Sequence, residues 1–335
     1  MDEEAPSASV LPDEVIACVL SKLQLEDLTS AELACACWRR VAAESGAWLA
    51  LACRSHPELA PYARNAPVRE DASQARQPTP RALCKRIAAL AVAPPLGART
   101  IIAEALGASS TDNPEEAVRN TLNRRTRNAM WQLPAYWSSA GSDRADAEDF
   151  VLYRLASHIS VVSAVKLRPF RAFFQAHQPV YSPLRVRVML GAASEDVGGF
   201  GAPGEAAVHY HYTSPDFEVE QTDELQTLTL PAPVVCFGGV LRLQLCGRAQ
   251  SQAADDRYYV CLAHVCATGR PWYGFSPSQD GLSLSFDARS ALAGAAAPPF
   301  GGSSESEADS GTSDDEGDED DEPVDDLLDL VLGQA

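Results

Sequence analysis

The sequence predicts an α+β chain of several parts: a small helical module at the N-terminus, a helical spacer, an antiparallel β-sandwich and a disordered acidic tail. Three observations lead to this fold class. Apolar residues recur at helical spacing up to about residue 54, and they alternate with polar residues in several short runs further on. After Phe300 the chain is rich in Ser, Gly and acid and has no aromatic side chain, a composition that cannot offset the entropy lost on ordering. The expected boundaries of the four parts are 8–54, 55–130, 131–275 and 276–335.

The first module, residues 8–54, begins with a helix-start signal. Pro12 suits the first helical position, and Asp13 and Glu14 lie where the helix dipole favours negative charge. The apolar residues that follow recur at helical spacing: Val15, Ile16, Val19, Leu20, Leu23, Leu25, Leu28, Leu33 and Val41. A module of this length is too short to bury a self-sufficient core without disulfides, metal or a partner, yet it displays apolar residues on more than one side. We therefore expect a second polypeptide to cover part of it.

This module resembles the F-box. The residues that carry the resemblance are Leu11, Pro12, Ile16, Leu20, Leu23, Leu25, Leu28, the block Cys35-Ala36-Cys37-Trp38-Arg39, and Trp48. In that family a three-helix module docks on a Skp-family adaptor and so joins a cullin-type ubiquitin ligase. The resemblance implies that adaptor docking involves Leu11, Pro12, Ile16, Leu20, Leu23, Leu25 and Leu28, although some of them must close the module's own core. The alternative is an ordinary small helical bundle with these leucines in its core.

Residues 55–130 are expected to form a connector that becomes helical. An irregular start is predicted by prolines at 57, 61, 67, 78 and 80. Residues 81–92 resume a helical pattern. Asn113 is a candidate cap and Pro114 suits the first turn of a further helix, which we expect to run to about Asn128. Such a helical spacer would hold the next domain at a fixed angle from the first module.

Between residues 131 and 275 the apolar residues alternate with period two. Alternating runs indicate strands at 159–168, 185–190, 241–245 and, as the last strand, 257–266. Several short strands with Pro and Gly turns between them indicate an antiparallel sandwich of about 140 residues. The Gly- and Ala-rich residues 191–208 indicate an expanded loop within it.

Several segments of this region carry a second resemblance. They are 110–116, 120–122, 136–139, 169–175, 179–182, 212–215 and 243–248. Through them the block from about Asp112 to Pro271 resembles the second domain of a plant and algal F-box family, a galactose-binding-like (discoidin-type) jelly roll. The resemblance implies a domain that captures a target through loops at one end, where binding surfaces on such scaffolds usually lie.

Four aromatic side chains of the sandwich are candidate target-binding residues: Tyr136, Trp137, Tyr181 and Trp272. Exposed rings of this kind stack on sugar rings. The alternative for each is packing in the core or at a strand edge, because large aromatic side chains dominate protein cores.

The tail, residues 276–335, carries most of the charge. Residues 301–335 hold fourteen of the 46 acidic side chains and no Lys or Arg, so the first 300 residues have a net charge near −5. Apolar residues at 324, 327, 328 and 331 fall on one helical face. They indicate either a short helix over 323–332 that docks in a partner's groove or a frayed terminus.

Charge and segment composition argue against several classes of protein. The near-neutral body offers no basic face for a nucleic acid. The acidic start Met1-Asp2-Glu3-Glu4 lacks the positive region of a signal peptide, and no run reaches the eighteen apolar residues of a membrane span. Nine cysteines without framework spacing fit a reducing compartment, so we expect a cytoplasmic or nuclear location, or both.

Motifs for catalysis and metal binding are missing from the sequence. It contains no Gly-rich phosphate loop, nucleophile elbow or HExxH. His209 and His211 would share one face of a strand, but no third ligand has suitable spacing for a metal. We therefore expect no enzymatic activity, no cofactor and no metal.

Together these patterns favour the substrate receptor of a Skp–cullin–F-box ubiquitin ligase. The Skp-family adaptor would bind the helical module, and the sandwich would bind a target protein, with or without a sugar or phosphate modification. The mechanism would be proximity, because holding a target's lysines near a charged conjugating enzyme raises their effective concentration. Two alternatives stay open: a glycan-binding module with an accessory F-box, and a scaffold that binds the adaptor without promoting ubiquitination.

Overall fold

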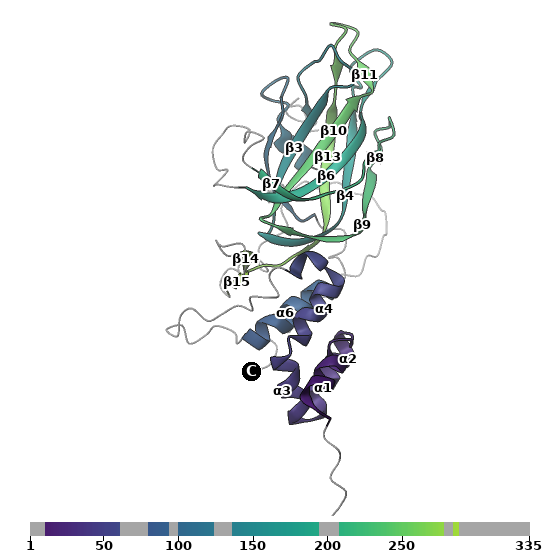
Figure 1. Cartoon of the computed structure of the whole chain (residues 1–335). Helices are drawn as coiled ribbons and strands as arrows, with labels where there is room; N and C mark the ends of the chain where they lie inside the picture. Colours follow the sequence, from purple (N-terminus) through teal and green to yellow (C-terminus); the bar gives the residue numbers. More distant parts are fainter. Residues whose placement is uncertain are drawn as a thin grey trace, which may run out of the picture.

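The computed structural model describes residues 11–60, 80–93, 100–123, 136–193, 208–277 and 284–287. The helices lie at one end of an elongated molecule, and an antiparallel β-sandwich packs against them and forms the other end (Figure 1). The expected α+β class is therefore confirmed. The acidic tail and the helix expected over 323–332 lie outside the described residues. Within the described ranges, the helices are too short or too polar to span a membrane.

The helical part consists of short helices packed around one core. Their bounds are α1 (Asp13–Leu20), α2 (Leu25–Ala34), α3 (Ala36–Glu44), α4 (Ala47–Ser55), the 3-10 turn η1 (Pro57–Leu59) and α6 (Pro80–Val92). Pro12 lies just before α1 and not in its first turn. Gly46 has a φ of 69°, a left-handed conformation that lets the chain turn sharply between α3 and α4. The core of these helices includes Ile16, Leu20, Leu28, Val41, Trp48 and Leu51, all buried.

A buried carboxylate joins α6 to the preceding helices. Glu32 on α2 is only 2% exposed and accepts a hydrogen bond from Nε1 of Trp48 at 2.9 Å. The same carboxylate forms an ion pair with Nζ of Lys85 on α6. The Lys85 ammonium also lies 5.0 Å from the centre of the Trp48 ring, within cation–π range. The helix expected over 81–92 is thus confirmed as α6 and is anchored to the first module.

Replacing Glu32 by alanine is expected to lower the free energy of unfolding by about 1–3 kcal/mol, because the Trp48 indole N–H would be left buried without an acceptor. Glu32→Gln is the matched control, since it removes the charge but keeps an acceptor, and it should lose less. Thermal unfolding followed by circular dichroism separates the two variants. Wild-type stability in Glu32→Ala would contradict this role.

Two antiparallel sheets form the sandwich. In the first, the strand order is β1-β3-β10-β6-β7 with β8 beside β6, and in the second it is β2-β13-β4-β5 with β9 beside β4. The first sheet contains β1 (Ile102–Ala108), β3 (Glu148–Leu155), β6 (Pro183–Ala193), β7 (Val208–Thr213), β8 (Phe217–Glu218) and β10 (Val240–Arg248). The second contains β2 (Trp137–Ser138), β4 (Ile159–Arg171), β5 (Val180–Tyr181), β9 (Gln226–Phe237) and β13 (Cys261–Pro271). Two small hairpins are formed by β11 (Gln250–Ser251) with β12 (Tyr258–Tyr259) and by β14 (Phe275–Pro277) with β15 (Leu284–Phe286).

The core between the sheets follows the period-two pattern of the strands. Its fully buried side chains include Val186, Val188, Leu190, Leu241, Leu243 and Leu245, from the adjacent strands β6 and β10. Strands expected at 159–168, 185–190 and 241–245 are therefore confirmed within β4, β6 and β10. Most of the loop expected at 191–208 lies outside the described residues.

The strand expected at 257–266 as the last of the fold is wrong in its bounds and its rank. The structure divides it into β12 and β13, extends β13 to Pro271, and places β14 and β15 after it. The pairing of β13 with β4 shifts register between Thr268 and Gly269. A Cβ atom on Gly269 would clash with the carbonyl oxygen of Val161, so the close approach that continues the strand needs glycine here.

The helical spacer expected over 55–130 is wrong in its second half. Residues 102–108 form β1, which pairs with β3 in the first sheet. Between β1 and residue 123, where this described range ends, the only helical element is the short 3-10 turn η2 (Val118–Leu122). Pro114 begins no helix. Thr121 instead fixes this segment to the sheets, because its Oγ1 lies 2.8 Å from the Tyr153 hydroxyl and its carbonyl oxygen 2.9 Å from His264 Nδ1. Packing against the sandwich therefore overrides the local helix signal.

The helices and the sandwich share one hydrophobic cluster. Ile87 and Ala91 of α6 belong to the same buried set as Ile159, Val235 and Trp272 of the sandwich. A polar contact reinforces this junction, because Glu58 Oε1 in η1 accepts a hydrogen bond from the Val235 amide of β9 at 2.7 Å. The base of the sandwich is therefore joined to α4, η1 and α6 by buried contacts and not by a free linker.

Glu58 makes this junction sensitive to acid. Burial raises the pKa of the Glu58 carboxyl, but the His56 ring, whose Nδ1 lies 3.7 Å from Glu58 Oε1, and the hydrogen bond from the Val235 amide outweigh it, so the pKa lies below its ordinary value. A depressed carboxyl pKa contributes stability above the unfolded-state pKa of about 4.3, and this contribution is lost as the pH falls through the folded value. We expect the melting temperature of the wild type to fall more than that of Glu58→Gln between about pH 5 and pH 3. Parallel curves for the two proteins would contradict this.

Candidate functional site

Five apolar residues at the start of the helical part are exposed. They are Leu11, Pro12, Val15, Val19 and Leu33, here called the exposed apolar set. Val15 and Val19 are four residues apart on one face of α1, and Leu11 lies two residues before the helix begins. Leu33 on α2 is 74% exposed, more than any other large apolar side chain among the described residues. Large apolar side chains grouped on a surface mark sites of interaction with another protein.

The adaptor-docking residues expected from the sequence divide into two groups. Ile16, Leu20 and Leu28 are at most 1% exposed, so they are among the residues expected to close the module's own core. Leu23 and Leu25 are half-buried at its edge, and Leu11 and Pro12 are exposed. Helical spacing generates two apolar stripes on α1, and only the packing against α2 and α3 decides which stripe faces inward.

Sequence reasoning did not assign Val15, Val19 and Leu33 to docking, although all three were part of the recognised apolar pattern. The available signal was an offset of one residue: Val15 and Val19 precede Ile16 and Leu20 and therefore lie about 100° away on the helix. One apolar stripe is enough to pack a surface helix on its own core, so a second, adjacent stripe indicates contact with another polypeptide.

The orientation of α1 is set by two arginines. The Arg54 guanidinium of α4 donates to the carbonyl oxygens of Ser21 and Leu23, just after α1 ends. At the other end of α1, Arg40 Nη2 donates to both carboxylate oxygens of Asp13 at 2.9 Å. These contacts hold α1 in place while its outer stripe faces solvent.

A second candidate site is a pocket of about 180 Å³ in the sandwich, far from the helices. Strand β4 begins at Ile159 in the cluster shared with the helices and reaches the pocket at Phe170. At about 3.3 Å per residue this separates the pocket from the helical junction by about 35 Å. Four segments distant in sequence build the pocket: 112–116, 136–138, 170–181 and 252–261.

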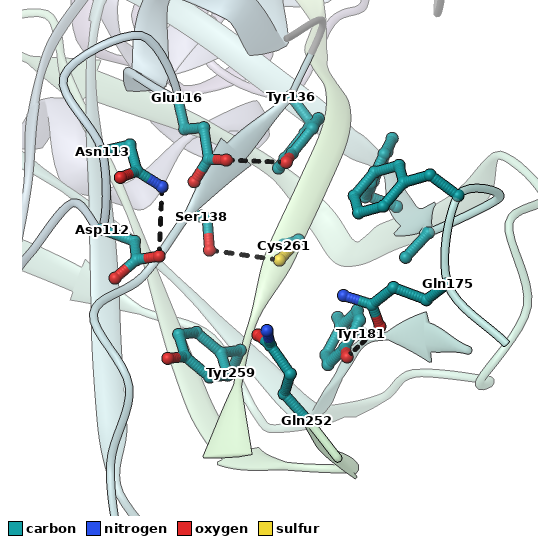
Figure 2. Close-up of a pocket in the computed structure, with 13 residues that line it drawn as sticks. Asp112, Asn113, Glu116, Tyr136, Ser138, Gln175, Tyr181, Gln252, Tyr259 and Cys261 are labelled. Atoms are coloured by element: carbon teal, nitrogen blue, oxygen red, sulfur yellow. Dashed lines mark hydrogen bonds between the residues drawn. The ribbon is translucent and has the colours of Figure 1, made fainter. Parts of the chain in front are cut away.

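The floor of the pocket is the first residue of β13 with its partner on β2. Cys261 Sγ donates to Ser138 Oγ at 3.3 Å, and both side chains are buried (Figure 2). Burial raises the pKa of the Cys261 thiol to about 12. The thiol is therefore protonated at neutral pH, and it is not a reactive nucleophile.

Aromatic rings form the walls of the pocket. The rings of Tyr136 and Phe170 stack with centroids 3.7 Å apart, and the Phe174 ring lies 6.3 Å from that of Phe170. Across the pocket, Tyr181 and Tyr259 meet edge to face at 6.3 Å. Figure 2 shows Tyr136 facing Tyr181 and Tyr259 over the Ser138–Cys261 floor.

The three tyrosine hydroxyls are held as hydrogen-bond donors. Tyr136 donates to Glu116 Oε1 at 2.7 Å, Tyr181 to Gln175 Oε1 at 2.6 Å, and Tyr259 to Asp255 Oδ2 at 2.6 Å. The pKa values of all three phenols are raised, first by burial, and for Tyr136 and Tyr259 next by hydrogen bonds to carboxylates. The acceptor side chains therefore fix the positions of the three rings.

The loops around the pocket contain unusual backbone conformations. Among the described residues other than glycine, positive φ angles occur at His177 (62°), Gln178 (47°) and Asp256 (59°). The first two lie in the loop between β4 and β5, and the third lies between β11 and β12. Strained backbone of this kind concentrates at functional sites, where the surrounding structure holds it in place.

The four aromatic residues expected to bind a target have different positions. Tyr136 and Tyr181 line the pocket, but Trp137 and Trp272 are 0% exposed, so a direct binding role for these two is wrong. Trp137 points into the sandwich core because side chains alternate along β2, and its Nε1 donates to the Ser110 carbonyl at 3.1 Å. Trp272 belongs to the cluster at the helical junction.

Most pocket residues were not identified from the sequence as binding residues. Asp112 and Glu116 flank Asn113 and Pro114, which indicate a helix start, and Gln252 and Tyr259 carry no sequence signal for binding. Phe174 offered one, because two adjacent phenylalanines directly after a strand cannot both face the core. In the structure the Phe174 side chain is 60% exposed.

His209 and His211 lie on the exposed side of β7, as alternation predicts. His211 Nε2 is 3.1 Å from the Val235 carbonyl oxygen, so this ring contacts β9. Within the described ranges, no group of three His, Cys, Asp or Glu side chains could hold a metal ion.

Comparisons with known proteins place the two regions in context. Residues 8–55 match the F-box-like family model. An F-box protein of Arabidopsis thaliana is 38% identical over 181 residues, which are 50% of this chain and 48% of that protein. The chain thus spans about half the length of the curated relative it matches.

Solved structures similar to this chain match about half of it. Chitosan-binding module 1 of a Paenibacillus sp. IK-5 chitosanase/glucanase is 14% identical, with 51% of this chain and 98% of that one covered and a TM-score of 0.34. Discoidin II from Dictyostelium discoideum is 9% identical, with 50% of this chain and 55% of that one covered and a TM-score of 0.34.

Proposed function

We propose that this chain, which carries an F-box-like domain over residues 8–55, is the substrate-recognition subunit of a Skp–cullin–F-box ubiquitin ligase. The observation that carries the proposal is the exposed apolar set. Its five residues lie outside a helical core that is already closed by Ile16, Leu20 and Leu28. They lie outside the buried core of the described helices, so covering them by a Skp-family adaptor explains why they are apolar.

The energetics of this docking are favourable. Full burial of one Val or Leu side chain contributes roughly 1.5–3 kcal/mol, and these residues are already partly covered, so each adds roughly 1 kcal/mol. Several such contacts, with the backbone and polar contacts at the rim, are needed to exceed the free energy lost on association. The two arginine contacts of α1 reduce that loss, because they order the helix before binding.

The target would be captured at the pocket of the sandwich. The pocket lies about 35 Å along β4 from the junction between the helices and the sandwich, and the buried contacts of that junction keep it at a set position relative to the adaptor-docking helices. A rigid receptor presents the bound target to the conjugating enzyme at a high effective concentration, so no catalytic group is required in this chain. The nine cysteines are free thiols, which supports a cytoplasmic or nuclear location.

Affinity purification of the tagged chain from cells of its source, with and without proteasome inhibition, tests this function. The expected result is recovery of a Skp-family adaptor and a cullin, with a further bound protein that accumulates when the proteasome is inhibited. Absence of adaptor and cullin would overturn the proposal. Adaptor recovery without any protein that changes in turnover would favour a non-degradative scaffold.

A second candidate function is glycan binding. The pocket combines aromatic rings with the side-chain amides of Asn113, Gln175 and Gln252, and such groups suit the faces and hydroxyls of a sugar ring. A glycan array probed with the full chain distinguishes the two functions. Specific signals that Tyr136→Ala abolishes would favour a lectin, whereas silence across the array favours a polypeptide target.

A further inference from the structure

The pocket of the sandwich has an unbalanced charge. Asp112 and Glu116 contribute carboxylates to its lining, and none of the lining residues is Lys, Arg or His. Arg248 and Arg257, which act on the lining residues Cys261 and Tyr259, are paired with other carboxylates: Arg248 with Asp149 at 2.7 Å and Arg257 with Asp143 at 3.4 Å. The carboxylates of the pocket are therefore not neutralised by a cation of the described chain.

Both carboxylates keep a free oxygen. Glu116 Oε1 accepts from the Tyr136 hydroxyl, and Asp112 Oδ2 accepts from the Asn113 amide at 3.2 Å, as Figure 2 shows. With the described residues, Glu116 Oε2 and Asp112 Oδ1 make no hydrogen bond. An ionised carboxylate accepts several hydrogen bonds, so each has capacity for a donor from a ligand.

The negative potential of Asp112 and Glu116 reaches two other segments of the lining. After burial, their carboxylates contribute to the raised pKa values of Tyr136 and Cys261, and that of Asp112 also to the raised pKa of Tyr259, whereas Arg248 and Arg257 act in the opposite direction on Cys261 and Tyr259. A cation placed beside Asp112 and Glu116 would therefore lie in a favourable field.

Aromatic walls add a second attraction for a cation. Tyr136, Phe174 and Tyr259 present ring faces or edges around the cavity, and a Lys or Arg head group within about 6 Å of a ring centre gains cation–π stabilisation. The aliphatic stem of such a side chain also packs well against rings. A negatively charged ligand would find neither a donor cluster nor a favourable field.

The size of the cavity limits what can enter. Its volume of about 180 Å³ lies below the range of roughly 300–1,000 Å³ found for drug-sized ligands. One amino-acid side chain fills a space of this size. Phe173 and Phe174, 48% and 60% exposed, lie beside it in the loop after β4, and they offer an apolar rim for the residues that flank an inserted side chain.

We propose that this pocket receives one basic side chain, Arg or Lys, from an exposed segment of the target polypeptide. The proposal rests on the proposed function and names the class of target that its sandwich domain selects. Arg is expected to bind more tightly than Lys, because a planar guanidinium stacks on rings while it donates to two carboxylates at once. The receptor would thus read a basic residue flanked by apolar ones in a flexible segment.

A peptide experiment with the full chain tests this inference. A random peptide library displayed on phage is selected on the immobilised chain, and the best binder is synthesised with its central Arg replaced by Lys, by neutral citrulline or by Gln. We expect enrichment of Arg or Lys at one position and at least a tenfold weaker Kd for citrulline, which retains the shape but loses the charge. Selection without such enrichment, or equal binding of citrulline, would overturn the proposal.

Matched variants connect the binding to the pocket. Asp112→Asn and Glu116→Gln preserve shape and should each weaken the Arg peptide about tenfold, whereas Glu104→Gln, an acid on β1 paired with Arg154, should not. Phe174→Ala should weaken binding more than Phe173→Ala, which lies outside the lining. If these variants change only the binding of sugars on an array, the pocket reads a glycan and the proposal is wrong.

Adaptor recovery separates this inference from the proposed function. The three pocket variants, Asp112→Asn, Glu116→Gln and Phe174→Ala, should co-purify with a Skp-family adaptor as the wild type does, because the pocket lies at the other end of the molecule. Loss of Arg selection with intact adaptor binding would reject the pocket alone. Loss of adaptor binding by the wild-type chain would reject the receptor function, whatever the peptide result.

Discussion

Val15→Asp combined with Leu33→Asp is expected to weaken binding to a Skp-family adaptor by at least about a hundredfold. Both side chains belong to the exposed apolar set and make no contribution to the helical core, with Leu33 74% exposed and Val15 43% exposed. A carboxylate placed in a desolvated apolar interface loses several kcal/mol, and each 1.4 kcal/mol changes Kd tenfold. Isothermal titration calorimetry of purified variants with the adaptor measures the effect.

The control for this pair lies on the sandwich. Leu225 is 42% exposed and precedes β9, so Leu225→Asp introduces the same charge at a similar exposure without touching the helical part. It should bind the adaptor as the wild type does. Equal weakening by the control, or wild-type affinity in the double variant, would contradict the assigned surface.

The choice of positions matters because neighbouring leucines would give a misleading result. Leu20 is 0% exposed, so Leu20→Asp would place an unpaired charge in the core and unfold the module. Loss of adaptor binding in that variant would follow from unfolding and would say nothing about the docking surface. Val15 and Leu33 allow the interface to be changed while the fold is kept.

Arg248→Ala is expected to lower the free energy of unfolding by about 3–5 kcal/mol. Arg248 and Asp149 are both nearly buried and pair at 2.7 Å. The guanidinium also donates to the carbonyl oxygens of Ala140 at 2.8 Å and Tyr258 at 2.6 Å, so it connects β3 to the loop after β2 and to β12. Removing it leaves the Asp149 charge uncompensated in the interior. Urea denaturation followed by tryptophan fluorescence measures the loss.

Two controls define this prediction. Arg257→Ala breaks an ion pair with Asp143 in which both side chains are more than half exposed, and it should change stability by less than about 1 kcal/mol. Arg248→Met combined with Asp149→Leu removes both charges, so it should lose less unfolding free energy than Arg248→Ala, which leaves one charge unpaired. A loss in Arg257→Ala as large as that in Arg248→Ala would show that burial of the pair is not the cause.

The sequence patterns that predicted the fold correctly were long and regular. The 3.6-residue spacing in α1 and α6 and the alternation in β6 and β10 each indicate the type of element by themselves. The F-box resemblance rested on the same N-terminal residues, and the match over residues 8–55 confirms it. In these segments local propensity and tertiary packing favour the same structure, so the element can be predicted from one sequence alone.

The errors came from segments whose structure is decided by distant residues. Residues 112–122 carry a cap candidate and a first-turn proline, yet hydrogen bonds from Thr121 to β3 and β13 prevent a helix. Tyr136 and Trp137 are adjacent and chemically alike, but alternation in β2 sends one ring to the pocket and the other into the core. The pocket is lined by four segments up to 149 positions apart, from Asp112 to Cys261, and no local sequence pattern predicts that they lie together in the fold.

Calorimetric titration of the unmodified full chain with a purified Skp-family adaptor tests the central claim most directly. The account predicts a one-to-one complex with a Kd below about 1 μM, since several partly exposed apolar side chains are covered at once on helices already held in place. Absence of binding at adaptor concentrations of about 100 μM, with the chain folded as judged by its circular dichroism, would contradict it.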